Sequence, residues 1–179
     1  MIPMRACEDQ TKIEEFLTSA RIGFLGLTDG NSPYVVPLNY LWWDNRIYFH
    51  GSDQGKKVDL IHQNPSCCFT VSEEYGTIAQ PVPAHTDTAY MSVMIFGNAE
   101  LVHDPVEATE ALDRMLDKYV PGYYASPLSQ QHVIKYRSSR GHGVALYRME
   151  ALTLTAKENP VKTDEMFYPG RTQRMDSQD

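Results

Sequence analysis

The chain has 179 residues, 42% of them hydrophobic, and a formal net charge of −7 at pH 7. This is enough for one globular domain with a substantial core. The acidic balance excludes a broad basic surface, so we expect no nucleic-acid partner. The longest apolar stretches are strand-sized and the first ten residues carry charges. We therefore expect neither a membrane span nor a signal peptide, and we predict a cytoplasmic protein.

The first part of the chain predicts one helix followed by antiparallel strands. Apolar residues at helical spacing favour a short amphipathic helix over residues 11–20. Runs rich in β-branched and aromatic residues predict strands over 22–28, 34–43 and 46–50, with turn signals between them. Three strands joined by tight turns are typical of a meander.

The rest of the chain alternates long strands with helices. The clearest helix begins at Asp104-Pro105 and ends before Pro121-Gly122, and its apolar stripe is continuous. Before that helix we expect a short helix after Lys56-Lys57 that ends at Asn64-Pro65, a strand over 67–72 and an exposed loop around Pro81 and Pro83. A strand over 90–102, bent or bulged at Gly97, then leads to the long helix. After it we expect a mixed segment over 123–141 and a final strand over 143–155.

Six or so strands with few helices between them favour a mainly β fold, a barrel with flanking helices, over a parallel sheet. Apolar periodicity fades after Ala156, where the chain turns polar. We therefore predict a single domain over 1–157 and a polar C-terminal arm or tail over 158–179.

The segment Gly51-Ser52-Asp53-Gln54-Gly55-Lys56-Lys57 has the composition of an anion-binding loop. It combines a hydroxyl group, two glycines and two adjacent lysines, and it leads into a helix whose first N–H groups are free. Two lysines can neutralise a phosphate monoester, which carries about two negative charges. A solvated loop with exposed lysines explains the same pattern about equally well, and the spacing is not that of a nucleotide-binding P-loop.

The segment from Tyr34 to Tyr40 places Pro37 inside a strand. Proline removes one donor from a sheet ladder, so this strand belongs at an edge or a bulge. Its free backbone groups could bind a planar heteroaromatic ring. Protection of the edge against aggregation is the alternative explanation.

The motifs expected for a metal site, a cysteine redox pair or nucleophilic catalysis are weak or missing in the sequence. No CxxC or HExxH spacing is present, so we expect no metal site. Cys67 and Cys68 would point to opposite faces of a strand, which favours packing over a redox pair. No Ser, His and Asp arrangement indicates nucleophilic catalysis.

The order of these motifs resembles the pyridoxamine 5′-phosphate oxidase-like flavoproteins, and within them the nitroimidazole-resistance branch. The resemblance covers about residues 13–157. It rests on Tyr34-Val-Val-Pro-Leu-Asn-Tyr40, Ile47-Tyr-Phe-His-Gly-Ser52, Lys56-Lys57, Asn64-Pro65 and Ser92-Val-Met-Ile-Phe-Gly-Asn-Ala-Glu-Leu101. It implies an FMN-binding split barrel of antiparallel Greek-key type that works as a homodimer with the flavin at the interface.

The resemblance also implies a role for each matching residue. Lys56 and Lys57 would hold the FMN phosphate with help from Ser52, and His50 and Gly51 would lie beneath the ribityl chain. His50 is also the one candidate for a catalytic role or for a haem ligand. The isoalloxazine ring would lie along Val36, Pro37, Leu38, Asn39 and Tyr40, and Ser92 and Val93 would close on it from the partner subunit or a facing strand.

The chain departs from true pyridoxamine phosphate oxidases at its C-terminal strand. That strand lacks their substrate-recognising Trp/Arg pattern. The two tryptophans of the chain, Trp42 and Trp43, lie in the first third of the sequence instead. We therefore expect a flavin-dependent oxidoreductase acting on nitroaromatic or other small electrophilic molecules. The alternative is a flavin- or haem-binding carrier or sensor without turnover. FAD stays open in place of FMN.

Overall fold

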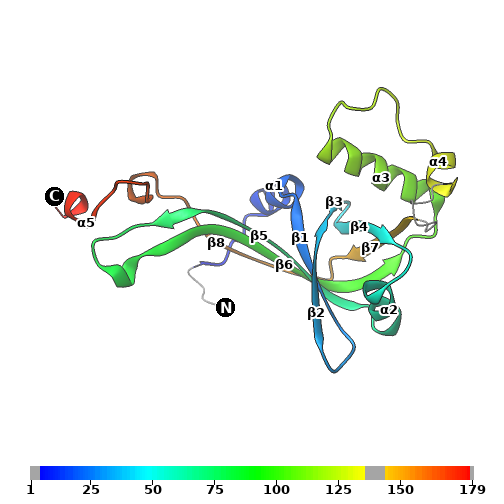
Figure 1. Cartoon of the computed structure of the whole chain (residues 1–179), viewed down its shortest axis with the longest axis horizontal. Helices are drawn as coiled ribbons and strands as arrows, with labels where there is room; N and C mark the ends of the chain where they lie inside the picture. Colours follow the sequence, from blue (N-terminus) through cyan, green and yellow to red (C-terminus); the bar gives the residue numbers. More distant parts are fainter. Residues whose placement is uncertain (1–4, 136–143, 178–179) are drawn as a thin grey trace.

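The structure is a computed structural model that describes residues 5–135 and 144–177. Within these ranges the chain forms a mainly antiparallel sheet with helices around it (Figure 1). The strands are β1 (Ile22–Thr28), β2 (Pro33–Asn39), β3 (Leu41–Trp43), β4 (Arg46–Ser52), β5 (Ser66–Ile78), β6 (Asp87–Leu101), β7 (Val144–Glu150) and β8 (Thr153–Asn159). The helices are α1 (Gln10–Ser19), α2 (Lys56–Gln63), α3 (Pro105–Tyr119), α4 (Gln130–Lys135) and α5 (Gln173–Asp176), with 3₁₀ turns η2 (Pro83–His85) and η3 (Thr163–Glu165).

The sheet curls into a barrel that does not close. Its strand order is β2-β1-β5-β6-β7-β4-β3, and β8 pairs with β6 beside this path. β6 is long enough to pair with two strands in succession: Tyr90 to Phe96 pair with β8, and Ala99 to Leu101 pair with β7. Since no ladder joins β2 to β3 or β4 in the described chain, the predicted split barrel with flanking helices is confirmed.

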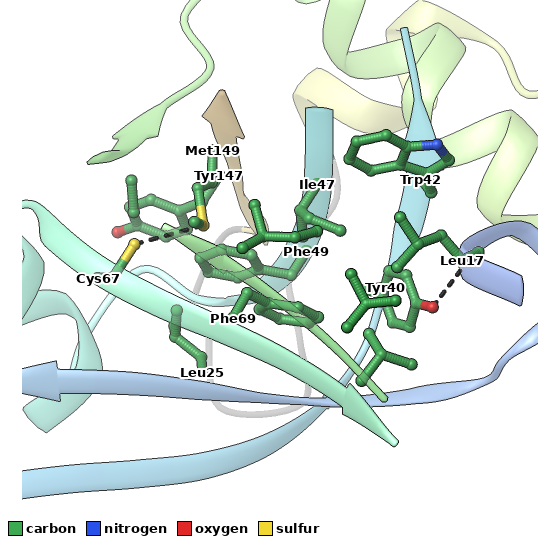
Figure 2. Packing of buried hydrophobic residues seen from close by; sticks show 14 of the residues in the cluster. Leu17, Leu25, Tyr40, Trp42, Ile47, Phe49, Cys67, Phe69, Tyr147 and Met149 are labelled. Carbon is green, nitrogen blue, oxygen red and sulfur yellow. Dashed lines mark hydrogen bonds between the residues drawn. The ribbon is translucent and has the colours of Figure 1, made fainter. Parts of the chain in front are cut away.

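Aromatic rings fill the barrel (Figure 2). Phe49 stacks on Tyr147 and on Phe69, with ring centres 5.5 Å and 6.5 Å apart. Tyr40 is fully buried, and its hydroxyl group donates a hydrogen bond to the Leu17 carbonyl of α1 at 2.8 Å. These rings each bury a large apolar surface, so they dominate the stability of the core.

The helices α1, α2 and α3 lie where the sequence predicts them. In α2 the side chains of Val58, Leu60 and Ile61 are buried. Asp104 caps α3 by accepting a hydrogen bond from Val106 N at 2.9 Å, and Pro105 opens the helix. A second, smaller core joins α3 to the face of β3, β4 and β7 that points away from the barrel.

The predicted meander is wrong, because the expected strand over 34–43 is two strands. β2 pairs with β1 and β3 pairs with β4, so the chain changes from one end of the sheet to the other at Tyr40. The hydroxyl group of Tyr119 accepts from Tyr40 N at 2.9 Å and lies 3.0 Å from Tyr40 O. This side chain of α3 replaces the ladder partners that Tyr40 would have in a continuous strand.

The two strands expected over 67–72 and 90–102 are longer than predicted, while the expected loop around Pro81 and Pro83 is present. β5 and β6 run on as a paired ribbon as far as Ile78 and Asp87, leaving residues 79–86 as the loop. The register shift lies at Glu74 and Gly76, not at Gly97. Gly97 instead permits close approach, since a Cβ atom there would lie 2.1 Å from the Glu150 carbonyl oxygen.

The expected final strand over 143–155 is split into β7 and β8, with the reversal at Ala151 and Leu152; residue 143 lies outside the described residues. After β8 the chain follows the β5–β6 ribbon away from the barrel (Figure 1). Ala79 N donates to Glu165 O at 2.9 Å and Phe167 N donates to Thr77 O at 2.8 Å. Residues 160–177 thus form an arm alongside the ribbon. Of the predicted mixed segment, residues 136–141 lie outside the described residues.

None of the helices described is long and apolar enough to cross a membrane.

Candidate functional site

Two consecutive lysines at the start of α2 reach toward different strands of the barrel. Lys56 Nζ lies 5.1 Å from the centre of the Tyr34 ring on β2, and Lys57 Nζ lies 5.5 Å from the centre of the Phe49 ring on β4. These are cation–π distances. The pair therefore sits where the barrel is open, between the strand predicted to face the flavin ring and the strand that carries His50.

Within residues 5–135 and 144–177, neither Lys56 nor Lys57 takes part in a salt bridge. Asp29 is near enough to the pair that, after hydrogen bonds from the backbone N–H groups of Ser32 and Asn31, the charge of Lys56 helps to lower its pKa. Lys56 is exposed, whereas Lys57 is half-buried and desolvation lowers its pKa. A desolvated cation without a carboxylate partner is stabilised by a bound anion.

The backbone around the lysines also suits an anion. Gly55 precedes α2 with a φ of 111°, a conformation that favours glycine, and no side chain caps the helix start. The first N–H groups of α2 are thus left to a ligand or to water. Ser52 Oγ accepts a hydrogen bond from Gln54 N at 3.2 Å, which fixes the loop and leaves its hydroxyl proton to donate.

Gly51 is the contact between the loop and Lys57. A Cβ atom on residue 51 would lie 2.5 Å from Lys57 Nζ. The absent side chain is the space that the ammonium group occupies. Sequence reasoning placed Gly51 in the site, and the structure gives it this steric role.

His50 lies two residues before the end of β4, next to this loop, on the opposite face of the strand from Gly51. The residue is exposed at the rim of a cavity, and its pKa is lowered by desolvation and then by the charge of Lys57. The cavity measures about 290 Å³ and lies against α3 and α4. Its lining is formed by His50, Leu112, Met115, Leu116, Leu128, His132, Val133 and Val144.

β2 is an edge strand, as its proline predicts, because among the described strands it pairs with β1 alone. Its side chains alternate between two faces. Val36 and Leu38 pack against the core, while Pro37 and Asn39 point outward. Tyr40 lies inside the core, so any contact it makes with a ligand would be through its backbone.

The two residues predicted on β6 divide between the same two faces. Ser92 is half-buried and points outward, whereas Val93 is fully buried in the barrel core. The pairing registers place Ile22 beside Asn39 and Ser72 beside Ser92, and the β1–β5 register continued by one residue aligns Ile22 with Ser72. Asn39 and Ser92 therefore lie on the same outer face, on strands separated by β1 and β5.

The structure thus brings Gly51, Ser52, Lys56 and Lys57 into one loop site, with His50 beside it. It places Pro37, Asn39 and Ser92 on a separate outer face of the sheet.

Sequence reasoning missed the cavity beside His50. Leu112 and Leu116 are spaced one helical turn apart in α3, a pattern that also fits ordinary core packing. It also missed the rings of Tyr34 and Phe49 beneath the lysines. Within the described residues no cluster of histidine, cysteine and acidic side chains is suited to a metal ion.

A family model described as pyridoxamine 5′-phosphate oxidase matches residues 9–157. No curated protein has a significant sequence match to this chain.

Solved structures share the fold. A provisionally assigned 5-nitroimidazole antibiotic resistance protein from Bacteroides thetaiotaomicron is 26% identical, with a TM-score of 0.68 over 85% of both chains. The flavocytochrome Anf3 from Azotobacter vinelandii is 21% identical, with a TM-score of 0.72 over 90% of this chain and 74% of its own. The FAD and heme binding protein from Mycobacterium smegmatis is 15% identical, with a TM-score of 0.70 over 90% of this chain and 78% of its own.

Proposed function

Since this chain belongs to the pyridoxamine 5′-phosphate oxidase family, we propose that it binds a flavin, with FMN the simplest, and uses it to reduce small electrophilic molecules. The observation that carries the proposal is the pair of adjacent lysines between β2 and β4, neither of which forms a salt bridge within the described residues. The flavin, when bound, supplies the electron transfer, and the protein supplies binding, orientation and electrostatics.

The loop site fits the phosphate of a flavin. Lys56 and Lys57 supply two positive charges, the Ser52 hydroxyl group supplies a donor, and the start of α2 supplies free N–H groups. Together these match the charge and the acceptor oxygens of a phosphate monoester. Lysine binds phosphate as a point charge, so the two ammonium groups would neutralise it without the fixed fork of an arginine.

The isoalloxazine ring would then lie along β2. This edge strand offers backbone N–H and C=O groups that no neighbouring strand uses. Pro37 and Asn39 would contact the ring with their side chains. Val36, Leu38 and Tyr40 would contribute backbone alone, because their side chains face the core.

A second copy of the chain would cover the ring and the outer face of the sheet. On this face Ile22, Phe24, Met94 and Phe96 are each at least 40% exposed. The outward residues aligned with them on β2, β1, β5 and β6 carry no charge. An uncharged apolar surface of this kind is typical of a protein interface, and a two-fold dimer is the commonest way to cover it. In such a dimer Ser92 lies on the interface.

For the substrate, we favour nitroaromatic or similarly electrophilic molecules over vitamin B6. The solved structure from Bacteroides thetaiotaomicron is provisionally assigned to 5-nitroimidazole resistance. Both tryptophans of this chain are engaged elsewhere: Trp42 is buried and donates to Glu14, and Trp43 packs against Tyr48 with ring centres 5.4 Å apart. Neither tryptophan lies on the C-terminal strand, where it could recognise a pyridoxine ring.

A flavin carrier or sensor without turnover is the second candidate. Around the loop site His50 is the one histidine among the described residues; desolvation, and then the charge of Lys57, lowers its pKa, and no acid–base pair accompanies it. Stopped-flow reduction by NAD(P)H or dithionite, followed by mixing with a nitroimidazole, separates the two candidates. Reoxidation by the nitroimidazole supports the reductase. Bound flavin that is reduced but never reoxidised by such acceptors supports the carrier.

Flavin binding itself is tested by titrating the purified protein with FMN and following flavin fluorescence. We expect saturable binding in the wild type, and weaker binding in Lys57→Ala and Lys56→Ala. Asp59→Ala is a matched control on the exposed side of the same helix. A colourless protein that takes up no FMN would overturn the proposal.

A further inference from the structure

A second pair of positively charged side chains, Arg21 and Lys118, lies at the other end of β2 from the loop site. The Arg21 guanidinium carbon lies 4.8 Å from the centre of the Tyr119 ring. Lys118 Nζ lies 4.1 Å from the centre of the Tyr40 ring, and both are cation–π distances. The Tyr119 hydroxyl group donates to the Arg21 carbonyl oxygen at 2.6 Å and accepts from Tyr40 N at 2.9 Å. These bonds hold the pair, which we call the distal cations, against the end of β2.

The distal cations leave a net positive charge at this end of the strand. Neither of them takes part in a salt bridge in the part of the chain that the structure describes. Lys118 Nζ donates one long hydrogen bond, to Leu17 O at 3.5 Å. Desolvation, and then the charge of Arg21, lowers the pKa of Lys118 to about 8, while the charge of Glu73 acts in the opposite direction. Two cations beside one carboxylate are stabilised by a ligand group that brings negative charge.

The length of β2 separates the distal cations from the loop site. Lys56 lies over the ring of Tyr34 near the beginning of the strand, whereas Tyr119 bonds to Tyr40 just after its end. The six residue steps from Tyr34 to Tyr40 cover about 20 Å of extended chain. This is comparable to the length of an extended FMN molecule. A flavin with its phosphate at the loop site and its ring along β2 therefore ends beside the distal cations.

The flavin ring has two chemically different ends, and the charge of the protein selects one of them. The dimethylbenzene end would desolvate the cations without offering them an acceptor. The pyrimidine end carries N1 and two carbonyl oxygens, all of them acceptors. NAD(P)H, oxidised to NAD(P)+, gives the ring two electrons and one proton, which leaves one negative charge shared by N1 and the C2 carbonyl oxygen. Charge near N1 is one of the ways in which a protein tunes a flavin.

We propose that Arg21 and Lys118 hold the pyrimidine end of the flavin ring and stabilise the negative charge that this end gains on reduction. The inference rests on the proposed function, because it takes the flavin phosphate to lie at Lys56 and Lys57. The two pairs of cations then have different roles. The lysines of the loop site bind both redox forms through the phosphate. The distal cations bind the reduced form more tightly than the oxidised form, which raises the midpoint potential of the bound flavin.

The test is the midpoint potential of FMN bound to the purified protein, measured against a reference dye. We expect Lys118→Met to lower the potential by about 30 mV, which for a two-electron couple is a tenfold loss of preference for the reduced form. Arg21→Gln should also lower the potential, and its exposed side chain makes a folding defect improbable. Affinity for oxidised FMN should change little in either variant. Lys118→Arg keeps the charge and should keep most of the wild-type potential.

Two control variants separate this effect from a general loss of charge or of binding. Arg114→Met removes a positive charge from the same helix one turn before Lys118, where the guanidinium group lies 4.6 Å from the centre of the Trp43 ring, away from β2. Its midpoint potential should equal that of the wild type. Lys57→Ala should weaken the binding of both redox forms alike and leave the potential unchanged.

The outcomes distinguish this inference from the proposed function. Wild-type potentials in Lys118→Met and Arg21→Gln would overturn the inference and leave the proposed function standing, because FMN would still be bound. An equal decrease in Arg114→Met would overturn it as well. If Lys118→Met does not fold, Arg21→Gln decides the question with the same measurement. A protein that binds no FMN refutes the proposed function, and the inference with it.

Discussion

Lys57 places its ammonium group over Gly51, so close that a Cβ atom on residue 51 would lie only 2.5 Å from Lys57 Nζ. The next nearest atom to that Cβ is Lys57 Cε, at 3.5 Å. Glycine at position 51 is therefore what allows the lysine to lie against the end of β4. This contact ties the geometry of the proposed phosphate site to one residue without a side chain.

Gly51→Ala should weaken FMN binding by roughly fivefold to tenfold without lowering the melting temperature, because the displaced group is the flexible end of a lysine. Titration with FMN and thermal unfolding measure the two effects. The double variant Gly51→Ala/Lys57→Ala is the control: once Lys57 is gone, the added methyl group should cost nothing more. Additive losses in the double variant would contradict the contact.

FMN affinity should decrease as the solution becomes alkaline, and the decrease should begin at lower pH than for a site built on an ordinary lysine. Desolvation lowers the pKa of Lys57, so its positive charge is lost earlier on the way to alkaline pH. The phosphate is already fully ionised in this range, since its second pKa is about 6. In Lys57→Arg the charge persists, so the affinity of that variant should stay flat. Parallel pH profiles for the two proteins would rule out Lys57 as the titrating group.

Met94→Lys should convert the proposed dimer to a monomer, because it places a charge among the exposed apolar side chains of the outer face, next to Phe96. The side chain is 40% exposed, so the fold itself should tolerate the change. Size-exclusion chromatography with light scattering measures the mass. Val82→Lys, on the exposed loop of the β5–β6 ribbon, is the matched control and should leave the mass unchanged. A wild type that is already monomeric with flavin bound would refute the dimer.

Gly97→Ala should destabilise the fold by about 2–3 kcal/mol, because its Cβ atom would lie 2.1 Å from the Glu150 carbonyl oxygen and 3.3 Å from its carbonyl carbon. Backbone cannot move aside as a side-chain end can. Urea unfolding measures the loss. Gly26→Ala, where the nearest atom is Cys68 O at 3.4 Å, is the matched control and should cost much less. Similar losses in both variants would show that the cost is general to strand glycines.

The elements whose signals are local could be predicted from the sequence. The helix after Asp104 is fixed by its cap, its proline and its apolar stripe, and the edge position of β2 follows from Pro37. The loop from Gly51 to Lys57 was recognisable because its residue types alone suit an anion.

Features that depend on distant contacts could not be predicted in the same way. The break at Tyr40 depends on the hydroxyl group of Tyr119, which lies 79 positions along the chain. The long β5–β6 ribbon includes Glu73, Glu74 and Gly76, which are poor strand formers and are held by pairing with β6. The cavity beside His50 exists only because α3 and α4 meet the end of β4.

The most direct test of the central claim is an FMN titration of the wild type beside Lys56→Ala/Lys57→Ala, followed by flavin fluorescence at neutral pH. We predict saturable binding by the wild type and at least about a hundredfold weaker binding by the double variant, with unchanged circular dichroism. Equal FMN affinities in the two proteins would contradict the account, because the flavin phosphate would then lie elsewhere.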